Sequence, residues 1–159
     1  MEHMTESKRY ALMRIPIFEK LSYDEMEIVG KDVRSLPFKA GDVILKEGSH
    51  GTSMFFVVDG ILEVVKQKEK VDDENVVIAT VSSGQSVGEM ALVDGFVRSA
   101  TVLVKTDGSL LTLKREDFEL LQEKHPEIGI KILKGISSLI SINLRKTSKK
   151  LTELMLPIT

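Results

Sequence analysis

An acidic and a basic side chain, Glu89 and Arg98, lie nine positions apart in a segment rich in glycine and apolar residues. Arginine carries a planar fork of donors that matches two phosphate oxygens, whereas glutamate accepts hydrogen bonds from hydroxyls and repels phosphate. A ligand with a hydroxyl pair and one phosphate charge would use both side chains. The alternative is a salt bridge between them across a turn, which is a common and weak interaction.

The backbone beside Glu89 predicts a further contact with an anion. Gly88 can end a strand and let the chain approach a ligand closely. Residues 89–92 are good helix formers and suffice for one helical turn. The first N–H groups of a helix lack partners within it and attract anions, although a glutamate at that place could also simply complement the helix dipole.

Three regions with different patterns surround this segment. Residues 1–30 read as helical, because Ser22 and Glu25 form a capping box and Pro16 divides the region into two short helices. Residues 33–113 contain short runs of β-branched and aromatic residues separated by glycines, which predicts an antiparallel jelly-roll β-barrel. The expected strands are 43–45, 54–58, 61–65, 76–81 and 102–104.

The last region, residues 115–156, is expected to be helical again. Pro126 suits the first turn of a helix that continues for about 30 residues, or about 45 Å. The charged stretch at 66–75 is expected to be an exposed hairpin tip. The chain is therefore predicted to be one α+β domain, mainly β, with helices at both ends of a barrel.

Composition argues against several classes of function. The 159 residues suit one domain, and a net charge of −2 disfavours nucleic acid as a partner. No apolar run is long enough to span a bilayer and no signal peptide is visible, so the protein is expected to be cytoplasmic. Cysteine is absent, the three histidines are scattered, and no catalytic motif is found. Neither enzyme activity nor a metal or other cofactor is expected.

The stretch V-G-E-M-A-L, then V-D-G-F-V, then R-S-A-T-V resembles the phosphate-binding cassette of the cyclic-nucleotide-binding domain family. That family includes catabolite activator proteins, regulatory subunits of cyclic-nucleotide-dependent kinases and nucleotide-gated channels. The likeness extends to G-D at 41–42, E-G at 47–48 and IPIFEKLS at 15–22, and to FFVVDGILEV at 55–64, which resembles the family's glycine-turned hairpin. Two positions depart from the family pattern, where Val87 replaces a phenylalanine and Val97 a frequent proline.

The resemblance implies a role for each position of the cassette, here residues 84–102. Glu89 would accept the ribose 2′-hydroxyl and Arg98 would pair with the cyclic phosphate, which the first amides of the short helix would also line. Gly88 would permit the close approach, and Ser99 would donate to the phosphate or the purine. The expected ligand-binding residues are Gly88, Glu89, Met90, Ala91, Leu92, Arg98, Ser99 and Ala100.

The resemblance also implies a function, that of a regulatory sensor for a cyclic nucleotide, cAMP rather than cGMP. The long last helix would act as a lid that reorients and signals to an effector protein. Asn143 and Thr147 are candidates for contact with the purine, although either could simply be an exposed residue. The alternative function is a degenerate member that serves as a dimerisation or interaction module without nucleotide.

The last helix leaves a question about self-association open. Its apolar residues Leu133, Ile140, Leu144, Leu151 and Leu154 follow heptad spacing, with Ser137 and Thr147 in the same seam. Such spacing favours a parallel homodimer through this helix, while packing on its own barrel is the alternative.

Overall fold

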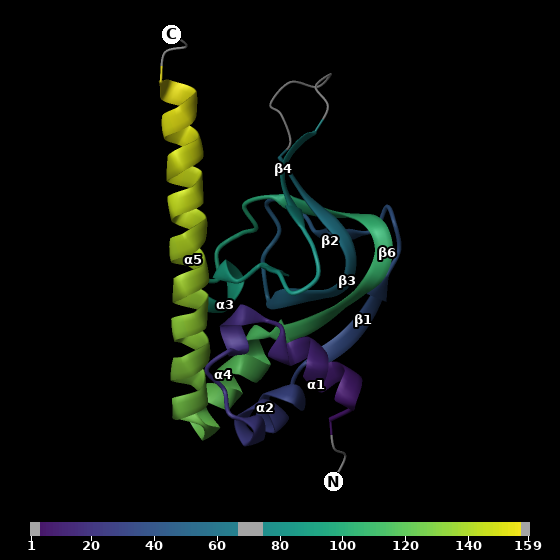
Figure 1. The fold of residues 1–159 in the computed structure, drawn as a ribbon, viewed down its shortest axis with the longest axis vertical. Helices are drawn as coiled ribbons and strands as arrows, with labels where there is room; N and C mark the ends of the chain where they lie inside the picture. The colour runs from purple at the N-terminus through teal and green to yellow at the C-terminus, as the bar shows by residue number, and fades with distance from the viewer. Residues whose placement is uncertain (1–3, 67–74, 157–159) are drawn as a thin grey trace.

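The computed structural model describes residues 4–66 and 75–156, which form helices at both ends of a curled antiparallel sheet (Figure 1). The helical start comprises α1 (Glu6–Met13), the 3₁₀ turn η1 (Pro16–Phe18) and α2 (Tyr23–Gly30). The strands are β1 (Arg34–Phe38), β2 (Val43–Leu45), β3 (Ser53–Lys66), β4 (Val76–Val81), β5 (Ser86–Val87) and β6 (Thr101–Lys114), with α3 (Met90–Val93) before β6. The chain continues into α4 (Arg115–Lys124) and α5 (Pro126–Met155). The predicted α+β class is confirmed.

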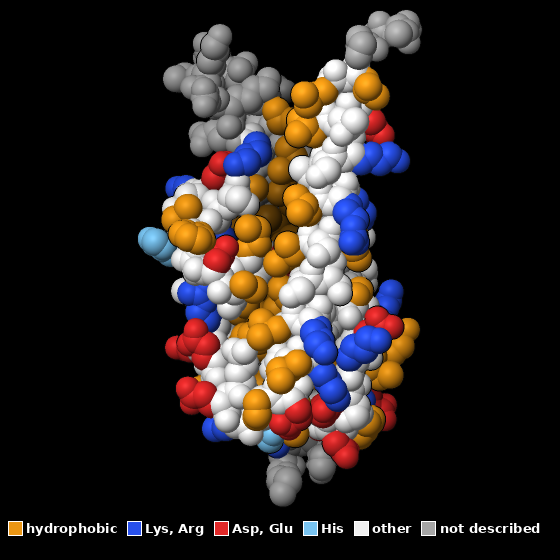
Figure 2. Space-filling view, turned by 90° about the vertical axis from the view of Figure 1, so that its left-hand side faces the viewer, with side chains coloured by type: hydrophobic (Ala, Val, Ile, Leu, Met, Phe, Trp, Pro, Cys, Tyr) orange, Lys and Arg blue, Asp and Glu red, His pale blue; other side chains and the backbone are white. Residues whose placement is uncertain are grey.

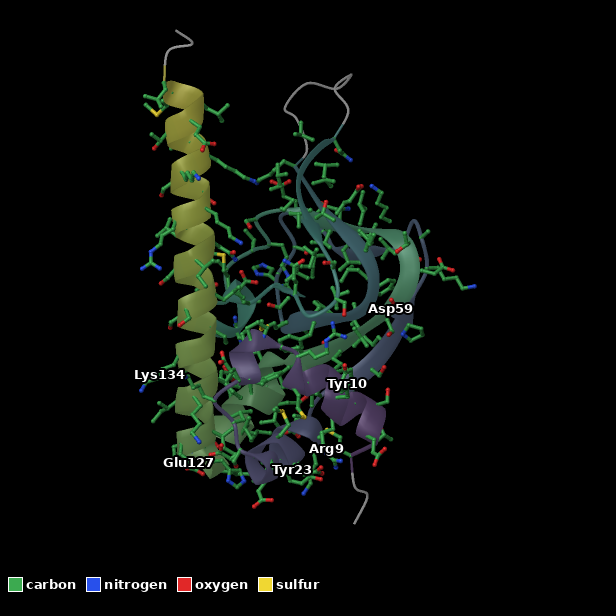
Figure 3. All side chains as sticks on the ribbon, viewed as in Figure 1. Arg9, Tyr10, Tyr23, Asp59, Glu127 and Lys134 are labelled. Carbon is green, nitrogen blue, oxygen red and sulfur yellow. The ribbon has the colours of Figure 1, made fainter. Side chains whose placement is uncertain are left out.

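The N-terminal helices begin and end where local signals place them. Ser22 and Glu25 form both hydrogen bonds of the predicted capping box, at 2.7 and 3.3 Å. Arg9 of α1 forms an ion pair with Glu27 of α2, and its guanidinium lies over the Tyr23 ring at 4.8 Å (Figure 3). These contacts hold α1 against α2, so the two helices act as one support beneath the barrel.

Strand β6 organises the sheet. It pairs antiparallel with β1, β2 and β3, while β3 also pairs with β4 and β5. A core cluster inside the barrel includes Phe38 and Leu62, and a second cluster packs the helices against the barrel end. In that second cluster the Phe18 and Phe56 rings lie 5.1 Å apart. The barrel and its helical support are thus joined by continuous apolar packing.

The glycine-turned hairpin predicted at 55–64 is wrong. Residues 53–66 form one continuous strand, β3, and both of its halves pair with β6. Gly60 has a φ of +92° and the register shifts around it, so the glycine forms a bulge that bends the strand. A Cβ on Gly108 of β6 would collide with the Asp59 backbone, so a glycine on the partner strand permits the bend.

Two short strands of the sheet were not predicted. Strand β1 (sequence RSLPF) contains a proline and two polar residues, and its pairing with residues 108–112 of β6 gives it its strand structure. Strand β5 is too short for a periodic signal. The predicted hairpin tip falls largely on residues 67–74, outside the described residues.

Helix α5 is anchored along its first half and exposed along its second. Ile128, Ile132 and Ile136 are buried in the helix-side core, and Lys131 binds both carboxylate oxygens of Glu25 at 2.7 Å. Residues 141–155 are exposed, and this part of the helix runs beside the barrel and past it (Figure 1). Within the described residues, no helix is both long and apolar enough to cross a membrane.

Candidate functional site

The residues that follow β5 reverse direction sharply and bring Glu89 and Arg98 to one side of the barrel. Gly88 has a φ of +78°, a left-handed conformation that favours glycine, and Glu89 directly precedes α3. Arg98 is held by its backbone N–H, which donates to the Ser49 carbonyl at 2.7 Å. The glycine and this long-range bond thus position the two predicted side chains.

The guanidinium of Arg98 is fixed by backbone carbonyls rather than by a carboxylate. Its Nη2 donates to the Ser53 carbonyl at 2.7 Å, and its Nη1 donates to the Gly88 carbonyl at 3.3 Å. Among the described residues no ion pair joins Arg98 to Glu89, so the salt-bridge alternative does not describe this arrangement. These two carbonyls orient the guanidinium, and an oriented side chain loses less entropy when it binds a partner.

Gly51 lies directly beneath this guanidinium, a role that was not predicted from the sequence. A Cβ on Gly51 would lie 2.7 Å from both the Arg98 Cζ and the Ala91 Cβ. The residue is buried, so a larger side chain could not turn away into solvent. The sequence shows Gly51 only as one of several turn glycines. Its contact with Arg98 is long-range, so no pattern of neighbouring residues predicts it.

The carboxylate of Glu89 lies partly buried between α3 and α5. Burial raises its pKa, while its own backbone N–H, the Asn143 side chain and the charge of Arg98 act in the opposite direction. Asn143 belongs to α5, so the cassette and the last helix already meet at this carboxylate. A buried acceptor of this kind suits hydrogen bonds from ligand hydroxyls.

A cavity of about 890 Å³ opens between the cassette, strand β4 and helix α5. Figure 2 shows hydrophobic side chains gathered along the hollow between α5 and the barrel. Its volume falls in the range of small-molecule sites, about 300–1,000 Å³. The predicted residues that line it are Gly88, Glu89, Met90, Ala91, Arg98, Ser99, Ala100, Asn143 and Thr147.

Two details of the predicted set differ from the expectation. Leu92 does not line the cavity, because its side chain is buried in the core cluster between the helices and the barrel. The Ala91 N–H already donates to the Gly88 carbonyl at 3.1 Å, so it closes a turn rather than pointing freely at the cavity. The lining also includes Phe96, Lys146 and Lys150, which were not predicted as site residues.

Replacing Glu89 by glutamine is expected to raise the melting temperature of the ligand-free protein at neutral pH. The folded-state pKa of Glu89 lies above the ordinary 4.5. Above pH 4.5 the unfolded chain therefore loses this proton more readily than the folded protein, and ionisation of Glu89 opposes folding. The gain should shrink as pH falls through that raised pKa and vanish below 4.5, where the wild-type side chain is neutral too. Calorimetric melts over a pH series measure the change in melting temperature. Glu123→Gln, at an exposed position of α4, is the control. A gain independent of pH would contradict it.

The chain matches known proteins over most of its length. A model of the family described as "Cyclic nucleotide-binding domain" matches residues 35–125. A cyclic nucleotide-gated potassium channel of Rhizobium etli is 36% identical over 120 residues, which cover 76% of this chain and 32% of the channel. The chain thus spans about a third of the length of this curated relative.

Solved structures of cyclic nucleotide-binding domains are similar to this chain in fold. A cyclic nucleotide-binding domain from Methylobacillus flagellatus superposes with a TM-score of 0.83 at 21% identity, over 99% of this chain and 90% of that one. The regulatory domain of Toxoplasma gondii PKA, solved with cAMP, gives a TM-score of 0.64 at 26% identity, over 72% of this chain and 43% of that one. Because the family model covers more than half of the chain, this protein belongs to the cyclic nucleotide-binding domain family.

Proposed function

We propose that this domain is a regulatory sensor that binds a cyclic nucleotide in the cavity between the cassette and α5, and that it acts by binding rather than by catalysis. The observation that carries the proposal is that Glu89, Arg98 and Asn143 converge on one cavity from three segments of the chain. One cation and one acceptor at fixed places match a phosphate and a hydroxyl on the same small ligand.

Four cassette residues and two residues of α5 have a part in the proposed complex. Arg98 pairs with the cyclic phosphate, and Glu89 accepts the ribose 2′-hydroxyl. Gly88 keeps the backbone close to the phosphate, since a Cβ there would lie 2.6 Å from the Arg98 Nη1. Ser99 is exposed at the cavity and can donate its hydroxyl. Asn143 and Thr147 of α5 contact the purine from the opposite side.

The proposed ligand is cAMP in preference to cGMP, a choice supported by the relative that was solved with cAMP. Isothermal titration of the purified protein with each nucleotide tests the proposal. We expect saturable binding of one nucleotide per chain, tighter for cAMP. If a well-folded sample binds neither, the domain is instead an interaction module that has kept the fold without the ligand.

The proposed output is a shift of α5 that an effector protein reads. The exposed second half of the helix lines the cavity through Ile142, Asn143 and Lys146, whereas its first half is anchored. A ligand that contacts the second half can therefore change its position without unpacking the core. Hydrogen exchange of 141–155 should slow on saturation with the nucleotide.

We also propose that the second half of α5 forms a parallel homodimer. Leu133 and Ile140 of the heptad seam pack against the chain's own core, which leaves Leu144, Leu151 and Leu154 at 64, 57 and 84% exposure. Apolar side chains exposed at heptad spacing favour a second copy of the helix.

Leu151→Lys is expected to convert this dimer into a monomer, because a charge in the seam would be buried without a partner. Sedimentation velocity of both proteins measures the change. Met13→Lys is the control, since Met13 of α1 is similarly exposed, at 64%, but lies outside α5. A wild-type protein that sediments as a monomer at all concentrations would contradict the proposed dimer.

A further inference from the structure

Arg115 is a second arginine beside the cassette, and the proposed ligand contacts do not use it. It is the first residue of α4, and its backbone N–H donates to the Thr52 carbonyl at 2.8 Å. The neighbouring Ser53 carbonyl accepts from the Arg98 side chain. One short stretch at the start of β3 therefore holds both arginines.

The guanidinium of Arg115 lies against the backbone of the cassette loop at Gly95. A Cβ on Gly95 would lie 2.5 Å from its Nη1 and 3.0 Å from its Nη2. Gly95 also has a φ of +69°, in the left-handed region. A glycine at this place thus lets a charged group lie directly on the loop that joins α3 to Arg98.

Within the described part of the chain, one nitrogen of this guanidinium lacks the hydrogen bond that its burial requires. Its Nη2 is buried without a hydrogen-bond partner among the described residues. A buried, unsatisfied donor destabilises a fold, and more so when it is charged. Burial lowers the pKa of Arg98, nearby Glu89 raises it, and the positive charge of Arg115 adds to the lowering. The two guanidinium groups therefore repel each other across the loop.

We propose that Arg115 is a positioning residue for loop 94–97, and that its Nη2 donates to a carbonyl oxygen of that loop once an anion is bound beside Arg98. The inference rests on the proposed function, because the bound phosphate supplies the anion. A negative charge beside Arg98 removes the repulsion between the two guanidinium groups. The loop can then close on both arginines, and α4 transmits its position to α5.

The substitution Arg115→Met tests the inference, because methionine keeps an unbranched apolar stem and removes the charge and the donors. The ligand-free variant should melt about 2–4 °C higher than the wild type. It should also bind cAMP about tenfold more weakly, the loss expected for one charged hydrogen bond. A residue with a merely structural role would not move these two quantities in opposite directions.

The control is Arg34→Met, which removes an exposed arginine on β1 and should change neither quantity. An Arg115→Met protein that melts lower than the wild type, or binds cAMP equally tightly, overturns the inference. If the wild type itself binds neither nucleotide, the proposed function fails first, so the two failures are distinguishable.

Should the methionine variant not fold, NMR of the wild-type arginine side chains replaces it. The Arg115 guanidinium hydrogens should exchange more slowly with water after cAMP is added, since they gain acceptors. Unchanged exchange at saturation would overturn the inference.

Discussion

Replacement of Arg98 by leucine is expected to weaken binding of the cyclic nucleotide by at least about 100-fold. Charge-assisted hydrogen bonds are each worth about 1.5–3 kcal/mol, and a planar guanidinium can supply two to a phosphate. Loss of two such bonds corresponds to 100-fold or more, because about 1.4 kcal/mol is a factor of ten. Leucine fills the space but offers neither charge nor donor, so titration calorimetry should detect little or no binding.

The same substitution removes two bonds within the protein, so the fold must be checked. Arg98 donates to the Ser53 and Gly88 carbonyls, and these acceptors lose their partner in the leucine variant. Arg98→Lys is the matched control, because it keeps the charge but not the fork and should bind with intermediate affinity. A folded leucine variant that binds as tightly as the wild type would place the phosphate elsewhere.

Gly135→Ala is expected to lower the free energy of unfolding by up to about 2 kcal/mol, because an overpacked contact costs about 1–3 kcal/mol and alanine returns about 1 kcal/mol of helix propensity. A Cβ at this position of α5 would lie 2.5 Å from the carbonyl oxygen and 2.8 Å from the Cα of Ile17. Both atoms belong to the backbone of η1, so relief requires moving an entire element. The contact should therefore outweigh the better helix propensity of alanine.

Gly129→Ala in the same helix provides the comparison. A Cβ there meets chiefly the side chain of Gln122, whose Cγ would be 2.6 Å away and can rotate aside. Chemical denaturation should therefore show Gly135→Ala clearly less stable than the wild type and Gly129→Ala close to it. Equal effects would mean that α5 does not depend on its close approach to η1.

Sequence patterns anticipated the elements that carry their own local signals. Ser22 and Glu25 mark the start of α2, and Pro126 marks the start of a helix that ends at Met155. Strands β2 and β4 begin and end at the predicted residues, because β-branched runs bounded by turn residues identify them. These features depend on neighbours within a few positions, which a sequence displays directly.

The wrong prediction of a hairpin at 55–64 shows that local sequence signals can fail where long-range pairing decides the structure. Asp-Gly between apolar runs is a strong local signal for a hairpin turn. In this fold both halves of β3 find their partner in β6, about 50 residues further along, and the glycine forms a bulge instead. Long-range pairing therefore overrode a local preference, as it also did for proline-containing β1.

The candidate site likewise contains residues that the sequence predicts and residues that only the fold brings together. Glu89 and Arg98 stand in a recognisable motif, so their placement at one cavity could be expected. Gly51 and Arg115 come from segments far from the cassette in sequence, and their contacts with Arg98 and Gly95 arise through the fold. Leu92 follows Ala91 in the same motif, yet the rotation of about 100° between consecutive helical residues directs it into the core.

The pairing of β6 with β1 affects when the domain can fold. Arg34 pairs with Thr112, so this ladder closes a long loop, and the entropy of closure delays such contacts. The cassette, residues 84–102, lies within that loop. A chain emerging from the ribosome therefore cannot complete the site until β6 and the following α5, which supplies Asn143, have been synthesised. Completion of the fold and formation of the cavity are then a single late event.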